Sequence, residues 1–186
     1  MIIKRFLLSF LMLFFAVNSV HADQVDFGNA DPSISALSQF EYMRGIWDVT
    51  IHMAQEDGSF KQTENKATVR AFYHSDGRSF QTIFSTIAGG FTTDIRTYNI
   101  EEKKWQILFM NARAQRWHKF EAEMIDDTMQ TFVEGGYSGS EPFDIKIIDK
   151  DIETQKFTKE VYRRAKGEQN WLKIYIMEYV KKPATN

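Results

Sequence analysis

Asp94, Arg96 and Tyr98 are the residues whose types and spacing most readily suggest chemistry, because they alternate along one predicted strand and so share a face. If this face points into the protein, a buried ion pair beside a phenol could orient a polar group of a ligand. If it points outward, the same side chains form ordinary cross-strand contacts on the surface. We favour the outward placement, and we keep all three residues as candidates for ligand binding.

Histidine is a second source of chemistry, and His118 is the best-placed example, on the same strand face as Phe120 and Met124. It could supply an acid–base group or contact a ligand, although a structural histidine inside the fold is the interpretation that we favour. His52 and His74 are expected in ordinary surface roles. Since no two histidines fall at i, i+2 in a strand or at i, i+4 in a helix, we expect no metal site.

Paired carboxylates are the third candidate. Glu121 and Glu123 share a strand face and could act as an acid–base pair, but they alternate with apolar residues, which favours a solvent-facing role. The sequence has no serine in a G-x-S-x-G setting and no glycine-rich loop for phosphate. The motifs therefore favour a protein without catalysis and without a cofactor.

Composition excludes several classes of protein. The 186 residues are 43% hydrophobic and 26% charged and include no cysteine, which is typical of a globular domain and excludes disorder and a disulfide scaffold. Asp and Glu number 25 against 23 Lys and Arg, and the signs alternate locally, as in residues 101–104. A surface of this kind lacks the clustered positive charge that nucleic acid requires.

Residues 1–22 are typical of a secretory signal peptide. Lys4 and Arg5 precede an apolar run over residues 6–17, and small residues stand at −3 and −1 of a cleavage site after Ala22. A run of twelve is shorter than the roughly 20 residues of a membrane-spanning helix. We expect a cleaved protein in the periplasm or outside the cell, with no stable membrane insertion.

The elements that must position these residues follow the leader. Residues 23–32 resemble a flexible lead-in, and Asp31-Pro32 is a helix-start signal. Apolar residues then recur at intervals of three (Ile34, Leu37, Phe40 and Met43), which predicts a short helix that ends by Gly45. We expect residues 33–183 to form a single domain.

Strand-like segments dominate the remainder of the chain. They are separated by connections of mostly two to five residues, which permit antiparallel pairing but no parallel crossover. Such a meander would be long for an open sheet, and closure removes both edges. The sequence therefore predicts an all-β fold, a closed antiparallel up-and-down barrel of about 8–10 strands behind the helix. The runs cover residues 46–55, 60–74, 78–88, 91–100, 104–111, 117–126, 128–134, 143–149, 153–165 and 169–181.

The alternation of residues in two strands predicts what the barrel encloses. In the first strand, period two places Trp47, Val49, Ile51 and Met53 inside, and these are further candidates for ligand binding. The last strand, 171–179, is largely apolar on both faces, with Lys173 on the face of Tyr175, Met177 and Tyr179. Its outer face should therefore be covered, either by the N-terminal helix or by a partner subunit in a homodimer.

Four short motifs resemble those of a known family. Gly45-Ile46-Trp47 is similar to the G-x-W opening of the calycin superfamily, which includes the lipocalins. More narrowly, the chain resembles a bacterial family of secreted lipocalin-like domains to which no function is assigned. That resemblance also uses Asp76-Gly77-Arg78, Tyr98-Asn99 followed by Trp105, and Glu178-Tyr179-Val180-Lys181, and it covers about residues 38–182.

The resemblance implies two features of the barrel. In the superfamily a basic side chain from a late strand packs over the opening tryptophan, a role for Lys181 or Lys173 here. Related haem-binding barrels of the nitrobindin type use a histidine near the end of the chain. The last strand here holds Met177 and Glu178 and no histidine, so haem is not expected.

The function that we expect is an exported, non-catalytic barrel that binds a small hydrophobic or amphipathic molecule in its interior. One alternative is a barrel enzyme acting on a lipid-like substrate, with groups such as His118, Asp94 or Arg96 as acid–base residues. Another is a structural or interaction module of the cell envelope, which a barrel without a cavity and a dimer formed through the apolar outer face of residues 171–179 would favour. The volume and lining of the interior distinguish the three.

Overall fold

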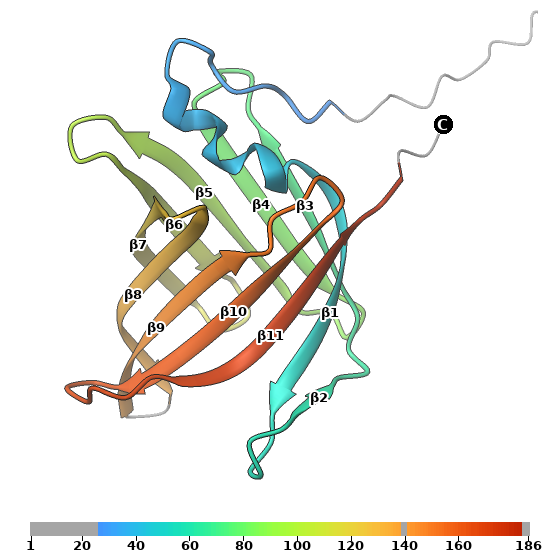
Figure 1. Ribbon diagram of the computed structural model, residues 1–186, viewed down its shortest axis with the longest axis vertical. Coiled ribbons are helices and arrows are strands. Elements are labelled where there is room, and N and C mark those ends of the chain that lie inside the picture. Colours follow the sequence, from blue (N-terminus) through green and yellow to red (C-terminus); the bar gives the residue numbers. More distant parts are fainter. Residues whose placement is uncertain (1–25, 139–140, 184–186) are drawn as a thin grey trace, which may run out of the picture.

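Ten antiparallel strands close into an up-and-down barrel in the computed structural model, which describes residues 26–138 and 141–183 (Figure 1). Each strand pairs with its successor, and closure comes from β1 and β11, which pair from Trp47↔Lys181 to Met53↔Tyr175. The predicted closed barrel is confirmed. Its strands are β1 (Gly45–Ala54), β3 (Ala67–Tyr73), β4 (Ser79–Thr86), β5 (Phe91–Asn99), β6 (Lys104–Asn111), β7 (Arg116–Ile125), β8 (Thr128–Ser138), β9 (Glu141–Lys150), β10 (Lys156–Ala165) and β11 (Leu172–Lys181).

A short extra strand distinguishes the structure from the expected pattern. The run 60–74 divides into β2 (Phe60–Gln62) and β3, since β3 pairs with the first half of β1 and β2 with its last three residues. The connection expected over residues 135–142 is also shorter, because β8 extends to Ser138 and β9 begins at Glu141, with a register shift between Val133 and Gly136. Asp126 and Asp127 have φ of 46° and 59°, the left-handed conformation that Asp tolerates in tight turns.

The predicted helix is a 3-10 helix, η1 (Ser35–Met43), and it closes one end of the barrel (Figure 1). Its buried residues are Leu37, Phe40 and Met43, and their spacing of three equals one turn of a 3-10 helix. The predicted start was wrong. The Asp31 carboxylate accepts hydrogen bonds from Ser33 N at 2.9 Å and from its Oγ at 2.6 Å, so Asp31-Pro32 forms a turn before the helix.

Two tryptophans of the barrel strands donate hydrogen bonds to η1. Trp47 Nε1 donates to Met43 O at 2.6 Å, and Trp105 Nε1 donates to Gln39 Oε1 at 3.0 Å. Both indole rings are fully buried. Lys181 Nζ lies 5.3 Å from the centroid of the Trp47 ring, so the basic residue that the resemblance implied over this tryptophan is Lys181.

The described part of the lead-in runs along β3. Tyr73 N donates to Phe27 O, and Asp31 N donates to Gly77 O, each at 2.9 Å. Residues 26–32 are thus bound to the barrel where the sequence predicts a flexible segment. The predicted signal peptide, 1–22, lies outside the described residues. Within the described ranges there is no helix with the length and apolar character needed to cross a membrane.

A β-bulge changes the expected faces of the last strand. Val161 pairs with Tyr175 and Tyr162 with Lys173, so Ile174 is an extra residue. Lys173 therefore leaves the face of Tyr175 and hydrogen-bonds Glu160 on the outside of the barrel at 2.6 Å. Of the two expected covers for the outer face of this strand, η1 was wrong, because η1 closes the end of the barrel (Figure 1).

Candidate functional site

The barrel interior contains a cavity of about 540 Å³. Met43, the last residue of η1, and Tyr179, near the end of β11, line it at its floor. The floor is the end of the barrel that η1 covers, and the mouth is the opposite end (Figure 1). Burial decreases along this axis. Ile107 is buried, Phe109 and Phe143 are half-buried, and Arg116 at the mouth is exposed. The cavity is therefore open at one end, with a volume in the range of small-molecule sites.

An ion pair on β5 contributes to the floor. Arg96 Nε and one terminal nitrogen donate to the Asp94 carboxylate at 2.6 and 3.1 Å, and both side chains are nearly buried, 9% and 12% exposed. The outward placement that we favoured for this face was wrong, and both residues line the cavity. Burial would lower the pKa of Arg96, but the adjacent Asp94 carboxylate keeps it above its ordinary value.

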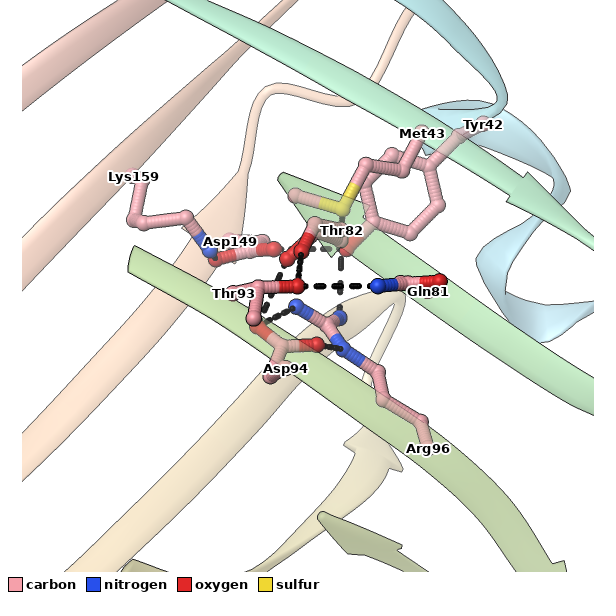
Figure 2. Close-up of polar contacts among 9 residues, drawn as sticks. All are labelled: Tyr42, Met43, Gln81, Thr82, Thr93, Asp94, Arg96, Asp149 and Lys159. Atoms are coloured by element: carbon pink, nitrogen blue, oxygen red, sulfur yellow. Dashed lines mark hydrogen bonds and ion pairs between the residues drawn. The ribbon is translucent and has the colours of Figure 1, made fainter. Parts of the chain in front are cut away.

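A second polar group faces the first across the floor (Figure 2). Tyr42, from η1, donates to Asp149 Oδ2 at 2.6 Å, and Lys159, from β10, donates to Oδ1 of the same carboxylate. Asp149 is 2% exposed and Lys159 14%. Burial lowers the pKa of Lys159, with Asp149 opposing the shift, while burial and the same carboxylate raise the pKa of Tyr42 well above its ordinary value.

A neutral side chain adds to the hydrogen bonding of this floor. Thr82 Oγ1 donates to Asp94 Oδ2 at 2.6 Å, whereas the bond from Gln81 Nε2 to Thr93 Oγ1, at 3.0 Å, lies on the opposite face of the same two strands (Figure 2). The Arg96 guanidinium also lies 4.4 Å from the centroid of the Phe40 ring. In the described part of the chain, no buried side-chain nitrogen or oxygen lacks a partner. The floor is therefore a satisfied, charge-balanced network.

Apolar side chains form the wall between the floor and the mouth. Ile107 and Phe109 come from β6, Phe120 from β7, Ile147 from β9, and Met177 from β11. Other lining residues of this kind are Val69, Phe84, Phe143, Ile145, Val161, Ile174 and Tyr175. An apolar ligand body would exchange water for these side chains, which is the main driving force for binding in such a site.

The predicted residues of the first strand lie beside the cavity rather than along it. Trp47 and Val49 are buried in the core beneath η1, and Ile51 packs partly against that core. Met53 pairs with Tyr175 and shares the face of the other three residues, but it lies at the open end of the barrel and is 43% exposed. None of these four residues is among those that line the cavity.

Tyr98 and His118 lie in different parts of the barrel interior. The Tyr98 ring packs against Trp105, with centroids 5.6 Å apart, and is separate from the Asp94–Arg96 pair. His118 shares a face of β7 with Arg116 and Phe120, both of which line the cavity, and its ring centroid is 6.4 Å from that of Phe109. Of the predicted candidates, the structure brings together Asp94 and Arg96.

Sequence reasoning missed Tyr42, Asp149 and Lys159. One signal could have identified Lys159, because it alternates with Phe157 and Val161 and so places a cation on an apolar strand face. Tyr42 and Asp149 carried no such signal. They are 107 residues apart in the chain and meet only when η1 closes the barrel.

The arrangement can enclose an apolar body and offer fixed hydrogen-bonding groups at one end. Its carboxylates and cations are close enough to move a proton between neighbours, but each is already paired within the network. In residues 26–138 and 141–183, no group of three or more His, Cys, Asp or Glu side chains is placed to hold a metal ion.

Comparison with known proteins bears on the fold. No family model and no curated protein sequence matches the chain. Among solved structures it is similar to "S-type Phycobiliprotein Lyase CPES from Guillardia theta", at 11% sequence identity and a TM-score of 0.51. The match covers 78% of this chain and 92% of the other. At this identity the likeness shows a shared fold and no more.

Proposed function

We propose that this protein is an exported, non-catalytic barrel that binds a small amphipathic molecule in its interior. The cavity of about 540 Å³ carries the proposal, because it joins an apolar wall to a polar floor. Such a combination is typical of sites that bury a ligand body and orient it through a few polar groups. Export rests on the signal-peptide pattern of residues 1–22, and the same pattern supports membership of the secreted lipocalin-like family.

The polar floor favours binding over turnover. Arg96 and Lys159 are each paired with a carboxylate, and Tyr42 donates to one of them. A charged side chain that is held in such a network has a fixed position and can orient a ligand. To accept or release a proton, however, it must break a buried ion pair. A barrel without a cavity would have favoured the alternative of a structural module, so the cavity argues against it.

Calorimetric titration with a panel of fatty acids, retinoids and haem tests the proposal on the protein that begins at Asp23. At least one apolar class should bind with a stoichiometry of one per barrel. A negative heat-capacity change should accompany binding, since apolar surface leaves water. Failure of every class to bind would contradict the proposal.

Two adjacent isoleucines on β9 provide matched variants. Ile147 lines the cavity, whereas Ile148 points to the opposite face of the strand. Ile147→Trp should fill the cavity and weaken binding at least tenfold, and Ile148→Trp should leave the affinity within a factor of about two. Circular dichroism of both variants establishes that each is folded. Equal affinities would place the ligand outside the barrel.

A further inference from the structure

Two arginines lie at the mouth of the cavity, at the end opposite η1. Arg116 is the first residue of β7 and pairs with Asn111 across the hairpin from β6. Arg163 lies near the end of β10 and pairs with Ile145 of β9. Both residues line the cavity, so their charges face the entrance from two sides of the barrel.

The charges of the floor and the mouth are balanced differently. At the floor Arg96 is paired with Asp94 and Lys159 with Asp149. At the mouth, neither Arg116 nor Arg163 makes an ion pair with any side chain that the structure describes. The floor therefore presents cations that are already neutralised, whereas the mouth presents cations that no described side chain neutralises.

This difference decides where an anionic group of a ligand is stable. At the floor, such a group would meet Asp94 and Asp149 and would have to compete with them for their cations. Like-charge repulsion and the desolvation of the anion both oppose that position. At the mouth, the anion gains charge-assisted hydrogen bonds and keeps part of its hydration.

The position of Arg163 suits this role. Its guanidinium carbon lies 4.4 Å from the centroid of the Phe143 ring, which is itself part of the cavity lining. Contact with the ring face fixes the orientation of the guanidinium plane, and the N–H groups at its edge remain available to donate hydrogen bonds to a ligand. The residue is half-buried, so solvent screens its charge less than it screens the exposed Arg116.

We propose that the ligand is an anionic amphiphile with a long apolar body and one carboxylate or phosphate head group. The head group binds Arg163 and Arg116 at the mouth, and the apolar body extends toward the Asp94–Arg96 pair at the floor. This inference rests on the proposed function, because it assumes that the cavity holds a ligand, and it adds the charge and the orientation of that ligand.

Four probes with the same sixteen-carbon chain test the head group. Palmitic acid, hexadecyl phosphate, hexadecanol and hexadecylamine are titrated into the protein below their critical aggregation concentrations. The acid and the phosphate should each bind about tenfold more tightly than the alcohol, and the amine should bind more weakly than the alcohol. A preference confined to the phosphate would identify a lipid-type head group, and one shared with the acid a general anion site.

Variants locate the preference at the mouth. Arg163→Gln combined with Arg116→Gln should reduce the ratio of acid to alcohol affinity to about one. Arg113→Gln is the matched control, because Arg113 is exposed in the same β6–β7 turn but is not among the lining residues. Raising the salt concentration should reduce the ratio in the unaltered protein, since the mouth is open to solvent.

The outcomes separate this inference from the proposed function. If hexadecanol binds as tightly as palmitic acid, the cavity binds ligands but the anion site at the mouth is wrong. If the double variant keeps the tenfold preference, the anion binds elsewhere and the inference is also overturned. If none of the four probes and no other apolar ligand binds, the proposed function itself fails, and this inference fails with it.

Discussion

Arg96 and Asp94 form a two-pronged ion pair inside the barrel, with nitrogen–oxygen distances of 2.6 and 3.1 Å, although they lie on a strand whose alternation suggested a surface position. The opposite face of the same strand carries Ile95, which is 41% exposed. The pair thus reverses the usual rule that the apolar face of a strand is the buried one. Because both ions are buried, each needs the charge of the other to offset the free-energy cost of leaving water.

Removal of one partner should therefore be costly. Asp94→Asn leaves the Arg96 guanidinium buried without a counter-charge and should lower the free energy of unfolding by about 3 kcal/mol. Urea denaturation followed by circular dichroism measures the change. Glu121→Gln, which breaks the exposed pair with Lys104 (3.1 Å), is the control and should cost less than about 1 kcal/mol. Equal costs for the two variants would contradict the buried ion pair.

Glu160 should make stability depend on pH. Its carboxylate lies on the outer face with Lys173, Tyr162 and Lys150, and although burial alone would raise its pKa, these hydrogen bonds lower it from 4.5 to about 2. The ionised form is thus favoured by folding. The resulting stability is present above pH 4.5 and is lost as the pH falls toward about 2.

Glu160→Gln provides the measurement. At pH 7 the variant should be less stable than the unaltered protein by about 2 kcal/mol, below the full shift because the two lysines are partly solvated. At pH 2 to 3 the two stability curves should approach each other. Glu153→Gln, at a 61%-exposed position, is the control and should change stability at pH 7 much less than Glu160→Gln does. A constant difference for Glu160→Gln would contradict the lowered pKa.

Tyr42 should stabilise the floor through its hydrogen bond to Asp149 at 2.6 Å. Tyr42→Phe removes one donor from a buried carboxylate and should cost about 1.5 kcal/mol in chemical denaturation. The control is Tyr175→Phe, because the Tyr175 hydroxyl makes no hydrogen bond among the described residues and should cost less than about 0.5 kcal/mol. If the two variants lose the same stability, the Tyr42 bond contributes nothing specific.

The same tyrosine can be followed by its absorbance. Burial and the Asp149 carboxylate raise the pKa of Tyr42 well above its ordinary value, so the phenol should remain protonated until the protein unfolds in alkali. Tyr42→Phe should accordingly leave unchanged the number of phenols that ionise before unfolding. A loss of one ionising phenol from that phase would show that Tyr42 titrates in the folded state.

A side chain at Gly45 should lower the stability of the protein. Its φ is +130°, and a Cβ there would lie 2.8 Å from Cε of Lys181, the residue that covers Trp47. Gly45→Ala should cost about 2 kcal/mol, from backbone strain and from displacement of that lysine. Gly58→Ala is the control, since Gly58 also has a positive φ but has open space around it.

A double variant separates the two causes at Gly45. In a Lys181→Ala background the crowding is absent, so Gly45→Ala should cost only about what Gly58→Ala costs. Thermal or urea unfolding of the four proteins completes the cycle. If Gly45→Ala is equally costly with and without Lys181, strain alone explains its effect.

Local sequence signals were sufficient for the strand order and for closure of the barrel. Turn residues such as Asp126-Asp127 mark the hairpins, and short connections leave antiparallel neighbours as the available arrangement. Period two in the first strand also placed the Trp47 ring in the core. These features depend on residues that are near in sequence or on the period of one strand. The resemblance implied Lys181 or Lys173 above this ring, and the structure places Lys181 there.

Face assignments and the floor of the cavity depended on contacts between distant elements. The bulge at Ile174 shifts the last strand by one residue, so Lys173 faces outward although period two placed it with Tyr175. Asp94 and Arg96 lie inside because each compensates the charge of the other, and a hydrophobicity pattern does not register such compensation.

The sequence by itself determined a closed antiparallel barrel with a short helix before it, because period, turn chemistry and connection length are local properties of the chain. Only the tertiary structure decided that Tyr42, Asp149 and Lys159 meet at the floor and that Arg116 and Arg163 both line the cavity at its mouth. Each of these groups joins residues from different elements. Their proximity is set by how far the strands tilt and shift as the sheet closes, and no single segment encodes that geometry.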